Sequence, residues 1–167
     1  MTLAETELLD PAENPLDVVE EVVASQGWEF ERRGDGDLSL CVAGSWCDYH
    51  IGFTYLDASG GLQVACAYDM RVPDRKRAEI CQLLALINER MWFGHFDLWA
   101  DEAIPMFRQG ILVRGGQPPT AEQIERAIEI AINECERYYP AFQFVLWGGK
   151  RAEEAIAATM LETAGEA

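Results

Sequence analysis

Hydrophobic residues recur along this chain with two different periods, and each change of period marks a change of predicted element. Over residues 14–27 the apolar side chains are spaced as on one face of a helix. Asn14 is suited to cap that helix and Gly27 to end it. Further helices are predicted over residues 72–91, 121–139, 141–147 and 150–162.

Between the helices, apolar and polar residues alternate, which is typical of strands with one buried face. Residues 47–55 give the clearest case: Tyr49 and Ile51 fall on one face, and His50 and Gly52 fall on the other. Short turns between neighbouring segments favour an antiparallel meander. Strands are predicted within residues 28–42, 47–55, 62–70, 95–103 and 104–114.

The predicted order is helix, three antiparallel strands, helix, two strands, helix and a C-terminal helix. The turn cluster at residues 32–37 leaves open whether the first strand is split in two. Pro140 is expected to interrupt the third helix. Because strands are bunched and helices segregated, the fold class is α+β. We expect one domain over residues 14–163, a flexible acidic segment at 1–13 and a frayed tail at 164–167.

Charge narrows the range of partners. The chain carries 29 acidic and 13 basic residues, for a net charge of −16. Binding to nucleic acids or to anionic membranes relies on Lys and Arg, so neither partner is expected. The acidity fits a protein partner that is basic or prone to aggregate, although solubility alone would also explain it.

The sequence also predicts a compartment. It has no apolar run of about 18 residues, which a membrane span requires. Its acidic N-terminus lacks the basic start and apolar core of a signal peptide. The five cysteines are odd in number and scattered, so we expect reduced thiols and a cytoplasmic location.

Cys41, Cys47 and His50 form the most plausible metal-ligand set by residue type. Zinc sites favour close pairs such as Cys-x-x-Cys, and these residues do not have that spacing. Cys47 and His50 also fall on opposite faces of a regular strand. We therefore predict no metal site, and the chain has no glycine-rich phosphate loop that would indicate a nucleotide cofactor.

The two histidines are the candidates for acid–base chemistry, with Asp48 next to His50 and Asp97 next to His95 in strand periodicity. In each pair the residues lie two apart on a polar strand face, a spacing common on any solvated strand surface. No nucleophile motif accompanies either pair. We therefore predict no catalytic residue and no enzymatic activity.

Aromatic residues concentrate in the segment "NERMWFGHFDLW", residues 88–99. The middle helix should run to Met91, Gly94 should end it, and a strand should follow. On that strand Trp99 falls on the same polar face as His95 and Asp97, and a tryptophan placed there suits a protein interface. The predicted interface residues are Ile87, Met91, Trp92, His95, Asp97 and Trp99.

The order of elements, with "YYPAFQFVLWGG" followed by "AEEAIAA", resembles the YbjN family of bacterial proteins over residues 15–163. Members are described as sensory transduction regulators and share the fold of type III secretion chaperones. The resemblance implies a homodimer that binds segments of other proteins. It also implies a dimer contact at residues 75–91 and 95–101, and it carries over no catalytic residue.

We therefore expect a non-enzymatic, chaperone-like or regulatory protein with an unidentified protein or peptide partner. Two alternatives stay open. One is a small-molecule sensor or enzyme with a pocket near His95 and Asp97. The other is a dedicated type III secretion chaperone with a cognate effector.

Overall fold

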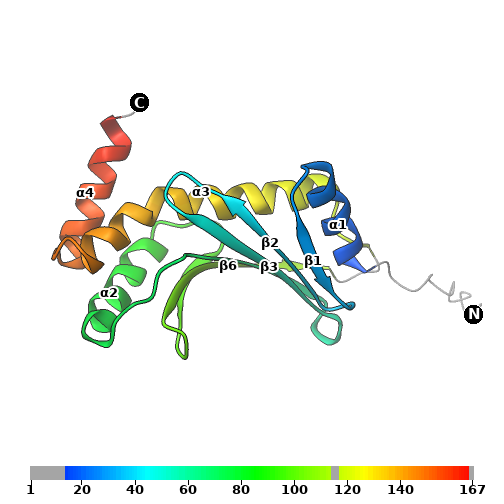
Figure 1. Cartoon of the computed structure of the whole chain (residues 1–167), viewed down its shortest axis with the longest axis horizontal. Coiled ribbons are helices and arrows are strands. Elements are labelled where there is room, and N and C mark those ends of the chain that lie inside the picture. Colours follow the sequence, from blue (N-terminus) through cyan, green and yellow to red (C-terminus); the bar gives the residue numbers. More distant parts are fainter. Residues whose placement is uncertain (1–13, 114–116, 166–167) are drawn as a thin grey trace, which may run out of the picture.

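The computed structural model describes residues 14–113 and 117–165 (Figure 1). Helices and an antiparallel sheet make up the fold, which confirms the predicted α+β class. In chain order the elements are α1 (Pro15–Ser25), β1 (Phe30–Arg33), β2 (Asp37–Ala43), β3 (Asp48–Leu56), the short 3₁₀ helix η1 (Asp57–Ser59), β4 (Gly61–Ala67), the 3₁₀ helix η2 (Asp74–Lys76), α2 (Arg77–Asn88), β5 (His95–Trp99), β6 (Ile104–Leu112), α3 (Ala121–Leu146) and α4 (Ala152–Gly165).

The strands form a six-stranded sheet in the order β1-β2-β3-β4-β6-β5. Four strands precede α2, because the first predicted strand is split. Gly34 adopts a positive φ of 61°, and the chain reverses there so that Arg33 pairs with Asp37. The turn cluster in the sequence therefore separates β1 from β2.

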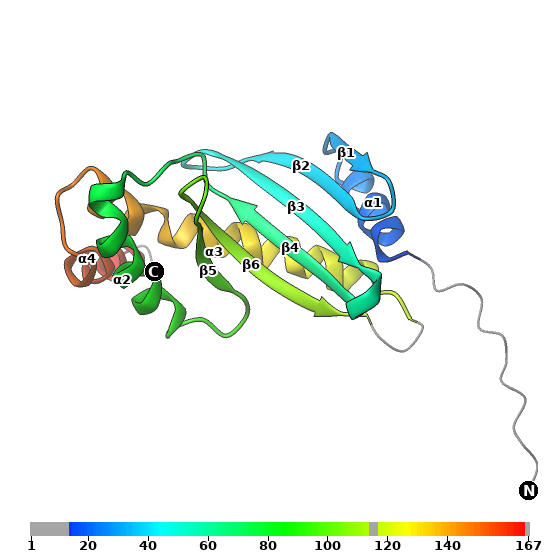
Figure 2. The same cartoon turned by 90° about the horizontal axis from the view of Figure 1, so that it is seen from below.

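One long helix, α3, lies along one face of the sheet (Figures 1 and 2). At one end of the sheet α1 packs against α3, and at the other end α2 and α4 pack against each other and against α3. The opposite face of the sheet has no helix over it in the described residues (Figure 2). The fold therefore has two layers, and only one face of the sheet is covered.

The core lies between α3 and the covered face. Alternate residues of β2, β3 and β4 are buried there, as the period of two predicts. Tyr68 lies at the centre, with its ring centroid 5.1 Å from that of Phe142 and 6.0 Å from that of Phe96. Its hydroxyl donates a hydrogen bond of 2.7 Å to the carbonyl of Cys135 on α3. A cluster of Tyr and Phe rings therefore lies at the centre of a core that is otherwise mainly aliphatic.

The prediction that Pro140 interrupts the third helix is wrong, since α3 continues through it from Ala121 to Leu146. A proline inside a helix costs about 3 kcal/mol, because it removes one hydrogen bond and crowds the preceding turn. Tyr138, Phe142 and Val145 are buried against the sheet in this part of α3. Each such side chain contributes about 1.5–3 kcal/mol on burial, which together offsets the cost of Pro140.

The middle helix ends earlier than the apolar spacing predicts. It stops at Asn88 instead of Met91. The side-chain amide of Asn88 donates to the carbonyl of Phe96 at 3.0 Å, and its oxygen accepts from the N–H of Phe96 at 2.7 Å. Asn88 thus holds the start of β5, a side-chain role that helical periodicity does not reveal.

At the C-terminus, α4 begins at Ala152 and continues to Gly165, two residues beyond the predicted domain end at residue 163. The predicted acidic segment at 1–13 and the last two residues of the predicted tail lie outside the described residues. None of the helices in the described part of the chain combines the length and apolar character that a membrane crossing requires.

Candidate functional site on the open face of the sheet

The open face of the sheet carries the residues that alternate with the core positions. On β3 these include His50, Gly52 and Thr54, and on β4 they include Ala65 and Ala67. The sequence pattern placed the β3 residues on a polar face, and the structure confirms this placement. Helix α3 covers the other face (Figure 2), and on the open face His50 is exposed and the other four residues are partly exposed.

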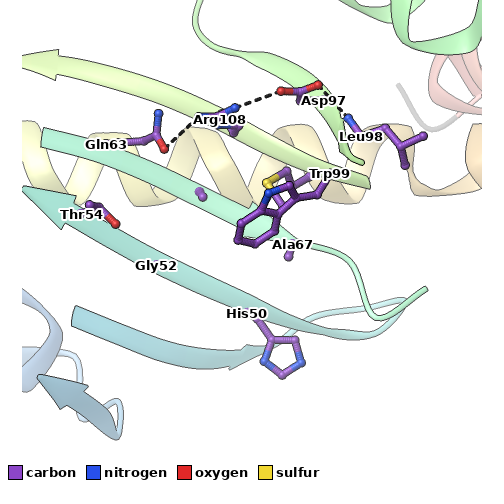
Figure 3. A pocket seen from close by; sticks show the side chains of 11 residues that line it. His50, Gly52, Thr54, Gln63, Ala67, Asp97, Leu98, Trp99 and Arg108 are labelled. Atoms are coloured by element: carbon purple, nitrogen blue, oxygen red, sulfur yellow. Dashed lines mark hydrogen bonds and ion pairs between the residues drawn. The ribbon is translucent and has the colours of Figure 1, made fainter. Parts of the chain in front are cut away.

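The centre of this face is hollow because its residues are small. Gly52 pairs with Ala65, and Ala67 lies two residues further along β4, so these three positions form a strip without large side chains across β3 and β4. Above this strip lies a hollow of about 400 Å³ (Figure 3). Its other lining side chains are Thr54, Gln63, Asp97, Leu98, Trp99, Met106 and Arg108.

Arg108 anchors the polar side of the hollow. Its guanidinium donates to the Asp97 carboxylate at 3.0 Å and to the Gln63 side-chain oxygen at 3.2 Å (Figure 3). The other carboxylate oxygen of Asp97 accepts from the backbone N–H of Leu98 at 2.9 Å. These contacts fix Asp97 in place and balance its charge.

A second hollow of about 570 Å³ adjoins the first and shares His50 and Gly52 with it. It reaches the β1 side of the sheet, where Glu29 and Glu31 line it. Hydrogen bonding to Arg33, 3.2 Å away, lowers the pKa of Glu31. The two hollows together extend across the open face from Trp99 on β5 to Glu29 and Glu31 at the β1 side.

The edge strand β5 is closed to strand addition where its backbone points outward. The N–H of Phe96 is bonded to Asn88, and the N–H of Leu98 is bonded to the side chain of Asp97. Side chains that satisfy edge donors in this way discourage pairing with another strand. A partner at this side of the molecule is therefore directed to the face of the sheet.

The structure gives the candidate acid–base pairs no catalytic arrangement. Asp97 bonds to Arg108 and to the backbone, while His95 is exposed and does not line the hollow. Asp48 and His50 are both exposed on the open face. Efficient proton transfer requires a base held in place near a reacting group, usually in a water-poor site.

Cys41 lies directly opposite His50 in the β2–β3 register. Partial burial, together with Asp48 and Asp69, raises the pKa of the Cys41 thiol. A raised pKa leaves the thiol protonated near neutral pH, whereas nucleophiles and metal ligands are thiolates. Within residues 14–113 and 117–165, no three His, Cys, Asp or Glu side chains come together in a way that could hold a metal ion.

The predicted interface residues fall into two groups. Ile87 is fully buried on the inner face of α2, so its assignment to an interface is corrected: its side chain cannot reach a partner. Met91 is half-buried and packs against the core. The remaining four, Trp92, His95, Asp97 and Trp99, reach the surface or the hollow, and Trp92 is 94% exposed.

Sequence reasoning missed Phe93, which is 59% exposed beside Trp92. It also missed Arg108 and the small-residue strip. The strip had a signal in the sequence: Gly52, Ala65 and Ala67 all occupy polar-face positions of predicted neighbouring strands. Arg108 had none, because its β6 segment does not alternate clearly.

Comparison with known proteins gave two findings. A family model described as "YbjN: Putative bacterial sensory transduction regulator" matches residues 15–144. Among solved structures, the chain resembles the "Crystal structure of YbjN, a putative transcription regulator from E. coli", with 17% sequence identity and a TM-score of 0.49. That likeness covers 90% of this chain and 92% of the other. A search of curated protein sequences found none that matches.

Proposed function

This chain belongs to the YbjN family, and from that premise we propose that it is a non-enzymatic regulatory protein that binds other polypeptides. The family description concerns regulation; binding to a polypeptide is our inference from the surface. The observation that carries it is the exposure of Trp92, Phe93 and Trp99 in one short segment beside the hollow. Tryptophan and other aromatic side chains are enriched where proteins bind one another.

The distribution of aromatic residues supports this function. Four tryptophans, at positions 46, 92, 99 and 147, are at least 49% exposed, whereas the aromatic residues of the buried core are Tyr and Phe. Large exposed apolar groups lose contact with water when a partner binds, and each contributes to affinity in proportion to the area buried. The geometry of the histidines and of Cys41 adds no competing catalytic arrangement.

Site-specific crosslinking tests the proposal. A photoreactive benzoyl-phenylalanine replaces Trp99, and in a matched control it replaces Trp147, which is also exposed but lies at the end of α3. Both variants are expressed in the natural host and irradiated. We expect one or a few discrete crosslinked proteins from position 99 and not from position 147. Identical crosslinks at both positions, or none at position 99, would contradict polypeptide binding at this surface.

A second candidate function is favoured by the hollow itself. A volume of about 400 Å³ is within the usual range of small-molecule sites, and Asp97 and Arg108 line it. A small-molecule sensor would show a rise in melting temperature with one metabolite of a screened set. That rise should disappear on Arg108→Leu and persist on Arg126→Leu, a change of an exposed arginine on α3.

We further propose a homodimer in the reducing cytoplasm. The exposed face of α2 carries uncharged residues, Ala78, Cys81, Gln82 and Ala85, which suits the helix contact that the chaperone-like resemblance implies. All five cysteines are unpaired, which fits a reducing compartment. Light scattering would give twice the chain mass of 18.7 kDa for a dimer.

A dedicated secretion chaperone would in addition require one cognate effector among the crosslinked proteins.

A further inference from the structure

We propose that the row of small residues Ser39, Gly52 and Ala65, which extends the strip onto β2, is the docking floor for a basic segment of another polypeptide. The main chain of that segment would lie on this floor, and one of its apolar side chains would pack against Trp99 and Met106. This inference rests on the proposed function, because it specifies the place and the chemistry of the polypeptide that binds. It assigns the hollow to a partner instead of a metabolite or a second copy of this chain.

The first observation concerns Gly52: within the described residues, no contact and no backbone conformation explains why this position is glycine. A Cβ atom built on Gly52 would meet no atom within 4 Å, and Gly52 is not among the glycines with a positive φ. Its pairing with β2 and β4 is continuous, so there is no bulge. Glycine inside a strand costs roughly 0.5–1 kcal/mol relative to alanine. A glycine with neither a steric nor a conformational reason fits a place where another molecule approaches the backbone.

The neighbours of Gly52 extend this floor sideways. In the strand register Ser39 lies on one side of Gly52 and Ala65 on the other, so three adjacent strands carry only small side chains in one row. With strands about 4.8 Å apart, the row is roughly 10 Å wide. That width matches the cross-section of a peptide segment. The gap left by a single missing side chain would be too narrow for such a segment.

The closed edge at β5 explains why a partner would use the face. The outward N–H groups of Phe96 and Leu98 already bond to side chains of this chain. A segment arriving at this side cannot pair with β5 without displacing Asn88 and Asp97. The accessible route leads over Trp99, which is 58% exposed, into the hollow.

Charge on the open face selects a basic occupant. Glu29 lines one end of the hollows together with Glu31, which is paired with Arg33, and Asp48 is exposed nearby on β3. Arg108 lies at the other end and is engaged by Asp97. A second copy of this chain would bring the same acidic groups and a further net charge of −16 to the contact. A segment rich in Lys or Arg would be attracted instead.

The test uses a library of random twelve-residue peptides displayed on phage, selected against the wild-type protein. The selected sequences are made as fluorescent peptides, and their affinities are measured by anisotropy. Gly52→Val and Ala65→Val each place a branched side chain on the floor, where it would occupy the space proposed for the peptide. Valine suits a strand, so the sheet should tolerate both changes. Ala43→Val is the matched control, because Ala43 is exposed on β2 outside both hollows.

We expect the selected peptides to combine Lys or Arg with an apolar residue. Both floor variants should weaken their binding roughly tenfold or more, while Ala43→Val leaves it unchanged. Gly52→Val should melt at or above the wild-type temperature, so the loss cannot come from unfolding. If Gly52→Val melts lower, Ala65→Val serves as the floor variant on its own.

Three results would overturn the inference. Peptides whose binding Gly52→Val and Ala65→Val leave intact would show that the floor is not the site. A wild-type dimer that becomes monomeric on Gly52→Val would assign the floor to a second copy. A metabolite whose stabilising effect Gly52→Val abolishes would assign it to a small molecule.

Failure of the inference and failure of the proposed function give different results. Peptides or crosslinked proteins that are lost on Trp92→Ala or Trp99→Ala, but retained on both floor variants, preserve polypeptide binding and reject only the floor. If no peptide is selected and no protein is crosslinked at position 99, both the docking floor and the proposed polypeptide binding are rejected.

Discussion

The two faces of the sheet are made by the same strands and differ in almost every other respect. Toward α3, alternate residues such as Tyr49, Ile51 and Phe53 are buried and closely packed. Toward solvent, the intervening His50, Gly52 and Thr54 surround a hollow (Figure 3). The covered face accounts for the stability of the fold, and the open face contributes little to it. The open face is therefore where function can set the choice of residue.

Two glycines show the difference most directly. Gly44 follows β2, and a Cβ built there would lie 2.0 Å from the ring of Tyr49 and 2.7 Å from the Glu136 carboxylate. Packing explains that glycine completely. Gly52 has open space around its Cβ position, so packing explains nothing about it. Gly44 is thus required by the packing around it, whereas Gly52 lies on a surface where packing within this chain does not require glycine.

The largest expected effect contrasts two aromatic residues of β5. Phe96 is 2% exposed and contacts Tyr68, Phe107 and Phe142, so Phe96→Ala should lower the free energy of unfolding by about 3–5 kcal/mol. Trp99 is largely exposed, so Trp99→Ala should lower it by less than about 1 kcal/mol. Urea unfolding followed by circular dichroism measures both.

Only the exposed residue should matter for binding. Trp99→Ala should remove the crosslinked or selected partner while the protein stays folded. Equal losses of stability for the two substitutions would mean that the open face is packed against something in the protein as purified, and the contrast between the faces would fail.

The second prediction compares Gly44→Ala with Gly52→Ala. The first substitution forces the Tyr49 ring or the Glu136 side chain to move, and overpacking of this kind costs about 1–3 kcal/mol. The second meets no neighbour and restricts the unfolded chain, so it should stabilise the protein by about 0.4–1 kcal/mol. Thermal melts of the two variants should shift in opposite directions. A loss of stability on Gly52→Ala would show that the open space is needed by the fold itself.

Alternation made much of this architecture predictable from the sequence. The period of two in β3 and β4 identified which residues face the core, and the side chains of β3 on the open face were assigned correctly. The helix predicted to begin at residue 121 likewise begins there, where Thr120 and Gln123 form a capping box at the start of α3. These features are local, so a short window of residues determines them.

The errors have non-local causes. Pro140 stays helical because of what its neighbours bury on the sheet, and α2 ends at Asn88 because that side chain bonds to β5. The assignment of Ile87 to the interface is the exception, because the local helical spacing already indicated a core position. The hollow requires β3, β4, β5 and β6 in one register, which no single segment encodes.

The smallest expected effect is on the free energy of unfolding at alkaline pH. It tests whether water reaches the residues buried on the covered face. Burial, and then the neighbouring Cys135 thiol, hold the pKa of Tyr68 well above the ordinary tyrosine value of about 10. The folded protein therefore keeps this proton where the unfolded chain releases it. Stability from Tyr68 is complete below about pH 10 and declines as pH rises further, by about 1.4 kcal/mol per pH unit.

Tyr68→Phe removes the titrating group, so its unfolding free energy should depend less steeply on pH between about 10 and 11 than that of the wild type. At pH 8 the variant should already be about 1 kcal/mol less stable, because the Cys135 carbonyl loses its donor. Tyr55→Phe is the control: the Tyr55 hydroxyl lies at the surface beside Asp57, and its removal should change the slope less. Parallel pH profiles for wild type and Tyr68→Phe would mean that water reaches Tyr68, and that the covered face is less closed than its packing indicates.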